Sequence, residues 1–127
     1  MTYSSKKQPR LDPASFLPLQ PAVFHILLAL GDGEKHGYAI KREIARRTGG
    51  SVRLGPGTLY GSIKRMLVQQ LIEESDERPD FSLDDERRRY YKITQLGQRV
   101  AAAEVERMRS LISLARAKRM VRGPEPA

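Results

Sequence analysis

Apolar residues recur at helical spacing in three successive stretches of the chain. Residues 19–30 carry them on one face and stop at Gly31, which predicts a first, largely buried helix. Residues 38–48 predict a second helix, with Tyr38 and its apolar neighbours facing inward and basic side chains facing out. Residues 54–71 begin with a Gly-Pro-Gly turn and predict a third helix. Three helices in this order are typical of a helix-turn-helix unit.

The third predicted helix begins near Thr58 and has two contrasting faces. Apolar side chains at Leu59, Ile63, Met66 and Leu67 share one side, which is the pattern of a buried stripe. Cations, hydroxyls and a small residue occupy the other side, a composition that can hold phosphate and contact base edges. The stretch therefore predicts a DNA recognition helix, and an ordinary solvated helix surface is the alternative. The residues on this outer face and its flank are Thr58, Tyr60, Gly61, Lys64 and Arg65.

Two strand candidates follow the third helix. Residues 71–75 and 88–93 have strand-like composition, and the polar stretch between them predicts a hairpin. Tyr90 and Tyr91 alternate along the second strand, so one packs inward and the other is presented to solvent or DNA. A helix-turn-helix followed by a hairpin is a winged helix.

A long helix is predicted over residues 95–120, with Thr94 as its cap. Its apolar residues alternate at spacings of four and three, as they do along a coiled-coil seam. One winged helix cannot cover so long an apolar face, so the chain is expected to form a homodimer through this helix. The residues expected at the dimer interface are Ala101, Val105, Met108, Leu111, Ile112 and Ala115.

These patterns divide the 127-residue chain into four segments. Residues 1–18 are basic and rich in proline and predict a flexible N-terminal arm, and residues 121–127 predict a disordered tail. Residues 19–93 form the winged helix-turn-helix and residues 94–120 the dimerisation helix. The predicted fold class is mainly α, with a two-stranded β wing. No apolar run approaches the length of a membrane span or a signal peptide core, so a cytoplasmic protein is expected.

The charge is large and unevenly distributed. A net charge of +8 favours a polyanionic partner, of which nucleic acid is the commonest. Residues 73–86 hold eight of the fifteen acids and carry −7, which leaves +15 on the rest of the chain. The chain has no cysteine, no glycine-rich phosphate loop and no HExxH motif, so neither an enzyme nor a metal or cofactor site is expected. His25 is interpreted as a partly buried structural histidine.

Three blocks occur in order along the chain: HGYAIKREI at 36–44, GTLYGSIKRMLVQQLI at 57–72 and RRRYYKITQLGQRV at 87–100. Together they resemble the PadR family of bacterial transcriptional regulators over residues 19–120, and the single C-terminal helix resembles its smaller subfamily. The resemblance implies a dimeric winged helix that binds a pseudo-palindromic DNA operator and represses a nearby gene. In some members a small-molecule effector releases the DNA.

The resemblance also implies DNA contacts for the matching residues, each with a structural alternative. Tyr38 could instead pack the second helix against the third, and Arg87 to Arg89 could instead neutralise the acidic loop 76–86. The chain has no Trp, so the aromatic drug pocket of some members is not carried over. A winged-helix adaptor for protein interaction or RNA binding is the alternative function. The implied DNA-binding residues are Tyr38, Thr58, Tyr60, Ser62, Lys64, Arg65, Arg87, Arg88, Arg89 and Tyr91.

Overall fold

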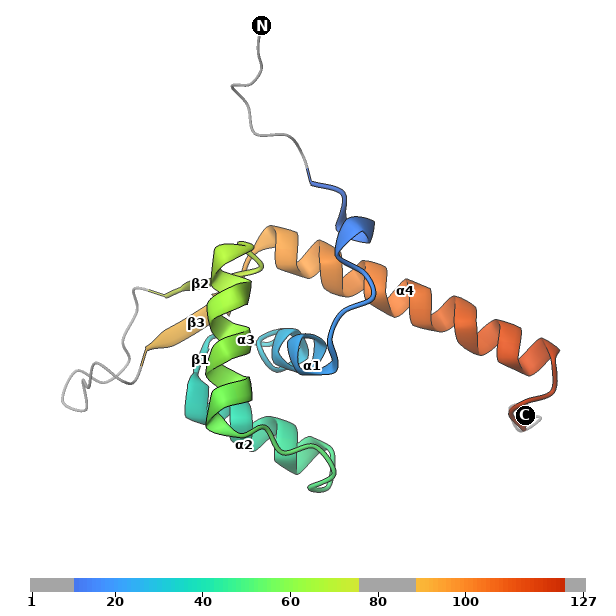
Figure 1. The fold of residues 1–127 in the computed structure, drawn as a ribbon, viewed down its shortest axis with the longest axis horizontal. Coiled ribbons are helices and arrows are strands. Elements are labelled where there is room, and N and C mark those ends of the chain that lie inside the picture. The colour runs from blue at the N-terminus through green and yellow to red at the C-terminus, as the bar shows by residue number, and fades with distance from the viewer. Residues whose placement is uncertain (1–10, 76–88, 123–127) are drawn as a thin grey trace, which may run out of the picture.

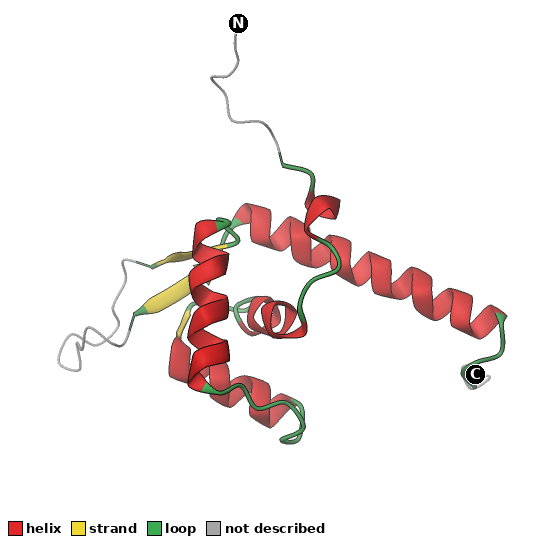
Figure 2. Ribbon diagram, viewed as in Figure 1, coloured by secondary structure: helices red, strands yellow, loops and turns green. Residues whose placement is uncertain are grey.

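The computed structural model describes residues 11–75 and 89–122 of the chain. Helices dominate the fold and a small sheet lies at one side of them (Figure 2). The last helix extends well beyond the body formed by the others (Figure 1). The predicted mainly α fold with a β wing is confirmed. In chain order the elements are η1 (Pro13–Phe16), α1 (Pro21–Ala29), β1 (Lys35–His36), α2 (Gly37–Arg47), α3 (Pro56–Val68), β2 (Ile72–Glu74), β3 (Tyr90–Ile93) and α4 (Gln95–Ala117).

The starts of the helices follow from local sequence. Both α1 and α3 begin with a proline, whose missing N–H has no helical partner to lose at this position. The α2 helix is capped by His36, whose Nδ1 accepts the backbone N–H of Ala39 at 3.2 Å. At the start of α4, the Thr94 hydroxyl accepts the N–H of Gly97 at 2.9 Å, as the sequence predicts. Pro56 starts α3 two residues before the predicted position near Thr58.

One hydrophobic cluster lies among α1, α2, α3, the sheet and the beginning of α4. The apolar stripes predicted for the first and third helices are buried in it, whereas Leu67 at the edge of α3 is half-buried. Burial of each such side chain contributes roughly 1.5 to 3 kcal/mol, so these stripes hold the helices together. The buried members from α1 and α3 are Val23, Ile26, Leu27, Ala29, Leu59, Ile63 and Met66.

The sheet has three antiparallel strands in the order β1-β3-β2, whereas the sequence predicts two. In the β2–β3 hairpin Glu73 lies opposite Lys92, and in the second pair Lys35 lies opposite Tyr91. The extra strand, β1, is part of the segment between the first two helices, where the sequence analysis predicts no strand. A strand of two residues is too short to show an alternating pattern in the sequence. It is recognised only from its pairing with β3.

The N-terminal segment differs from the predicted flexible arm from residue 11 onward. Residues 13–16 form the short helix η1, which is capped by Asp12 and lies beside α4 (Figure 1). Phe16 and Leu17 pack against the hydrophobic cluster. The proline-rich composition concealed these apolar residues, which find cover only when α4 is in place. Residues 1–10 and the tail from 123 lie outside the described residues.

The long helix α4 has a packed beginning and an uncovered remainder. Gly97, Val100 and Glu104 are buried, and no residue of α4 after Glu104 is buried. A Cβ at Gly97 would collide with the Leu71 carbonyl oxygen, so glycine allows α4 to lie this close to the end of α3. In the described part of the chain, no helix has the length and apolar character needed to cross a membrane.

Candidate nucleic-acid interface

Two exposed tyrosines lie where the start of α2 meets α3. Tyr38 is 57 % exposed and Tyr60 is 45 % exposed. The Tyr60 ring covers Gly37, because a Cβ at position 37 would lie 2.5 Å from the Tyr60 hydroxyl oxygen. Tyr38 therefore points outward, which corrects the prediction that it packs inward. Gly37 is the residue that lets the aromatic side chain of α3 lie against α2.

Cationic side chains accompany these tyrosines. The guanidinium carbon of Arg42 lies 5.5 Å from the centroid of the Tyr38 ring, a cation–π distance. Lys64 is exposed and follows Tyr60 by four residues, so the two share one side of α3. We call Tyr38, Arg42, Tyr60 and Lys64 the α2–α3 patch. Sequence reasoning missed Arg42, although its position one helical turn after Tyr38 is the signal that could have found it.

The other predicted contacts on α3 do not belong to this patch. Ser62 is 1 % exposed and accepts a 3.4 Å hydrogen bond from Arg65, so the predicted DNA contact by Ser62 is corrected. Arg65 is exposed, but it lines a hollow of about 340 Å³ together with residues 15–20 of the N-terminal segment. Thr58 is exposed in the first turn of α3. Arg65 therefore lies near the N-terminal segment, whereas Lys64 does not line this hollow.

The wing places its side chains differently from the prediction. Tyr91 is 6 % exposed and packs in the core, so its predicted DNA contact is corrected. Burial, aided by the nearby Glu74 carboxylate, raises the pKa of Tyr91, which is therefore neutral. Tyr90 stacks edge-on against His36, with ring centroids 5.3 Å apart.

The arginines of the wing are described only in part. Arg89 is exposed, and its Nη1 lies 3.2 Å from a carboxylate oxygen of Glu74. Its partner belongs to β2 and not to the loop 76–86, so the neutralisation of that loop stays a prediction. Arg87, Arg88 and the acidic loop 76–86 lie outside the described residues, so their predicted roles stay predictions.

The free part of α4 presents a continuous apolar face. Leu111, Ile112 and Leu114 are each about half exposed, at 51 %, 49 % and 51 %. Phe24 of α1 joins this face in lining a groove of about 420 Å³. An apolar face of this extent on a folded domain indicates a contact surface. Of the other predicted interface residues, Val105 is exposed and Ala101, Met108 and Ala115 are partly buried.

Sequence reasoning missed the contribution of α1 to this groove. Phe24 is partly buried and Leu28 is 44 % exposed, and both lie outside the buried stripe of α1. The signal is that α1 is apolar on nearly all sides, which indicates that more than one face is covered. The uncovered side of α1 thus adjoins the exposed apolar face of α4 at this groove.

His25 has the structural role that the sequence indicates. Its Nδ1 lies 3.2 Å from Nη2 of Arg47, a contact that joins α1 to α2. Partial burial, followed by the charge of Arg47, lowers the pKa of His25, so the neutral ring is favoured. Within residues 11–75 and 89–122, no three His, Cys, Asp or Glu side chains are grouped so that they could hold a metal ion.

Solved structures share this arrangement of helices and strands. A PadR family transcription regulator from Clostridium difficile has a TM-score of 0.63 and 23 % identity, covering 77 % of this chain and 97 % of that one. Bacillus subtilis PadR in complex with operator DNA has a TM-score of 0.58 and 16 % identity, covering 84 % of this chain and 51 % of that one. At these identities the likeness is one of fold, and the predicted winged helix is confirmed.

Sequence comparison then gives the family. Residues 26–103 match the transcriptional regulator PadR-like family, and the chain belongs to that family. An uncharacterised 37.1 kDa protein in a transposon of Streptomyces fradiae is 36 % identical over 86 residues, which are 68 % of this chain and 22 % of that protein. This chain therefore spans less than a quarter of that relative's length.

Proposed function

We propose that this chain is a dimeric DNA-binding regulator that represses transcription from a pseudo-palindromic operator. The observation that carries the proposal is the α2–α3 patch, where aromatic and cationic side chains are exposed on a helix whose opposite face is in the core. Family membership and the net charge of +8 support it. The structure of Bacillus subtilis PadR, which contains operator DNA, supports the same use of this fold.

In this proposal α3 lies in the major groove. Tyr60 and Lys64 face base edges or flanking phosphates, and Arg42 in the middle of α2 contacts the backbone. The apolar face of α4 pairs with that of a second copy, while Phe24 widens the contact on the α1 side. Two recognition helices held by one dimer would bind half-sites about 34–36 Å apart, which is one turn of the duplex.

The test is selection of duplexes by the purified chain from a random pool, followed by sequencing. We expect an inverted repeat, bound roughly 10³-fold or more tightly than random duplex at physiological salt. Transcription from a promoter that carries this repeat should fall when the protein is present. Equal affinity for random duplex and RNA would contradict the proposal and favour the adaptor function.

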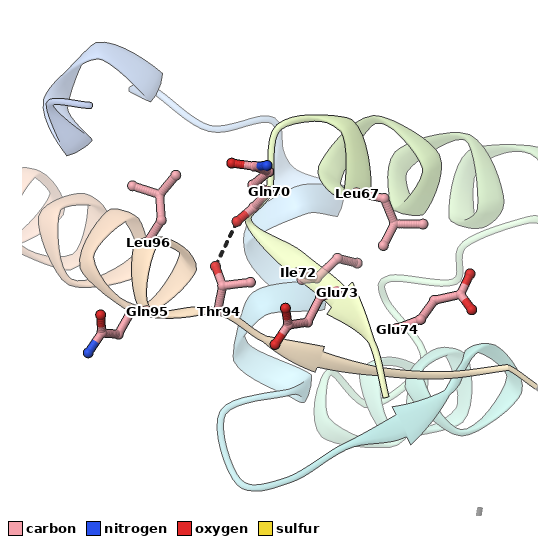
Figure 3. A pocket seen from close by; sticks show the side chains of 8 residues that line it. All are labelled: Leu67, Gln70, Ile72, Glu73, Glu74, Thr94, Gln95 and Leu96. Atoms are coloured by element: carbon pink, nitrogen blue, oxygen red, sulfur yellow. Dashed lines mark hydrogen bonds between the residues drawn. The ribbon is translucent and has the colours of Figure 1, made fainter. Parts of the chain in front are cut away.

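Release by a small-molecule effector forms part of the proposal. A hollow of about 540 Å³ lies beside β2. Of the lining side chains that Figure 3 labels, Leu67, Ile72 and Leu96 are apolar and the others are polar or acidic. At its edge the Thr94 hydroxyl donates to the Gln70 carbonyl oxygen at 2.7 Å, joining the start of α4 to the end of α3. The hollow contacts the recognition helix, the wing and α4 together, so an occupant could shift one relative to another.

Melting experiments on the wild type and Leu67→Glu test this site. A molecule that binds in the hollow should raise the melting temperature of the wild type, because a ligand of the folded state stabilises it. It should also weaken binding to the selected operator. The charged variant should lose both responses. An effector that acts equally on both proteins would have its site elsewhere.

A further inference from the structure

Glu104 is a buried carboxylate at the point where α4 leaves the domain. It is 1 % exposed, yet both of its oxygens accept hydrogen bonds. Oε1 accepts from Nε of Arg107 at 2.6 Å, and Oε2 accepts from Nη2 of Arg107 at 3.0 Å. Oε2 also accepts the backbone N–H of Leu19 at 3.1 Å, from a segment 85 residues away. These hydrogen bonds, chiefly those from Arg107, hold the pKa of Glu104 below its ordinary value.

The partner of Glu104 belongs to a segment that lies across α4. We call residues 11–20 the N-terminal strap. Near its start, the carbonyl oxygen of Leu11 accepts a hydrogen bond from Nη2 of Arg99 at 3.4 Å. The short helix η1 lies beside α4 in the middle of the strap, and Leu19 near its end bonds Glu104 (Figure 1). The strap and the beginning of α4 are thus joined at two points, of which Glu104 is the more buried.

Glu104 is also the last buried residue of α4, so the helix has no buried attachment to the domain beyond it. From Glu104 to Ala117 the free part extends roughly 20 Å at about 1.5 Å per residue. A tilt of about 10° at Glu104 would move a point at that distance by roughly 3 to 4 Å, comparable with the 3.4 Å rise of one base pair. A small change in the angle of α4 at this junction therefore displaces its end by about as much as one base pair of operator spacing.

We propose that Glu104 is a positioning residue for operator binding, because its bond to Leu19 fixes the angle between the domain and the free part of α4, while Arg107 of the same helix holds the carboxylate in place for that bond. That angle sets the half-site spacing that the dimer accepts. The inference rests on the proposed function, since spacing matters only to a dimer that contacts two half-sites. Only the carboxylate of this ion pair is buried, since the Arg107 side chain is 36 % exposed. Its hydrogen bonds suit the role, because they specify direction where apolar packing of similar volume does not.

The first test replaces the ion pair by apolar side chains, Glu104→Met with Arg107→Leu. Such replacements are often neutral or stabilising, so the variant should fold and dimerise. Affinity is measured for duplexes whose selected half-sites are moved apart or together by single base pairs. The affinity of the wild type should fall at least about tenfold when the half-site spacing changes by one base pair. The affinity of the double variant should vary by no more than about threefold across the series.

Two further variants keep this test decisive. Glu106→Gln is the matched control, because Glu106 is an exposed acid on the same helix, and it should keep the wild-type spacing preference. Glu104→Gln retains the shape of the side chain and serves as the test variant if the double variant does not fold. Its preference for one half-site spacing should be intermediate between those of the wild type and a chain without the ion pair. A folded double variant with the wild-type preference would overturn the inference and leave Glu104 with a role in stability alone.

A second measurement needs no DNA. The chain has no cysteine, so Val68→Cys provides a single spin-label site on α3, where the side chain is 77 % exposed. The distance between the two labels of a dimer should be narrowly distributed with Glu104 and broadly distributed in the apolar double variant. Unchanged distributions would overturn the inference even if operator binding is confirmed. A broadened distribution in a protein that prefers no duplex would instead contradict the proposed function and support the positioning role.

Discussion

The helices α3 and α4 are both amphipathic, but their apolar faces have different surroundings. In α3, Leu59, Ile63 and Met66 are all 2 % exposed or less, because α1, α2 and the sheet cover them. In α4 only the beginning is covered, and Leu111 and Ile112 farther along remain 51 % and 49 % exposed. A similar spacing of apolar residues therefore stabilises the fold of the domain in α3 and, as we propose, the dimer in α4.

The difference shows that a periodic apolar pattern indicates a covered face without identifying what covers it. For α3 the domain supplies the cover, and the remaining outer face is polar and free to meet DNA. For α4 the helix is longer than the domain beside it, so we propose that a second copy of the chain supplies the cover. Substitutions at matched positions on the two helices should therefore change different observables.

The largest effect is expected from Leu111→Glu with Ile112→Glu. Two charges placed on the exposed apolar face would be desolvated in a dimer, so the dissociation constant should rise by at least about 1,000-fold, or about 4 kcal/mol. Sedimentation measures the change in the dissociation constant. The melting temperature of the monomeric domain should not change. Glu106→Lys, a charge change at an exposed position away from Leu111, Ile112 and Leu114, is the control and should leave the dimer intact. A persistent dimer in the double variant would place the interface elsewhere.

The next effect is that of Ile63→Ala in α3. Ile63 is 2 % exposed, so truncation leaves a cavity and should lower the free energy of unfolding by about 2 to 5 kcal/mol. Denaturant unfolding at fixed protein concentration measures it. Thr58→Ala, on the exposed side of the same helix, should change stability by less than about 0.5 kcal/mol. Equal losses in the two variants would remove the contrast between the faces of α3.

A smaller effect separates the two cations of α3. Lys64→Ala should weaken operator binding by about 1 to 3 kcal/mol and reduce the salt slope by about 2 for a dimer, because each protomer loses one contact. Arg65→Ala should have less effect, since Arg65 faces the N-terminal strap. Titrations of operator DNA across a salt series measure the affinity and the salt slope of both variants. A larger loss for Arg65 would mean that the other side of α3 faces the duplex.

The smallest effect is expected for Arg89→Gln in the wing. The Arg89–Glu74 pair is exposed at both ends, with side chains 55 % and 45 % exposed, so its loss should cost no more than about 1 kcal/mol of stability. Because Arg89 is paired with Glu74, the salt dependence of DNA binding should stay close to that of the wild type. A slope reduced as strongly as in Lys64→Ala would show that Arg89 contacts phosphate.

Much of the fold could be predicted from local pattern. The boundaries of α1, α2 and α3 lie within a few residues of the predicted ones, because prolines, glycines and caps act over a single turn. The exposure of Tyr60 and Lys64 also followed from their angle to the apolar stripe. Tyr38 did not follow, because its position depends on Gly37, where the ring of Tyr60 already occupies the inward space.

The remaining differences concern residues whose surroundings come from distant parts of the chain. Alternation along β3 required one tyrosine to be buried, but only pairing with both neighbouring strands made it Tyr91. The sequence predicted that the Ser62 hydroxyl contacts DNA, but Ser62 lies on the side of α3 that is buried in the domain. Strand β1 has too few residues to be recognised from its own pattern.

The sequence by itself determined the three helices and their inner faces, the segregation of charge and the family blocks, since all of these are encoded by residues close together in the chain. Tertiary structure alone decided that Arg65 faces the N-terminal strap, that a third strand forms, and that Glu104 holds Leu19 from 85 residues away. The physical reason is that periodicity specifies which side of an element is apolar. What lies against that side depends on distances between segments, and these exist only once the chain has folded.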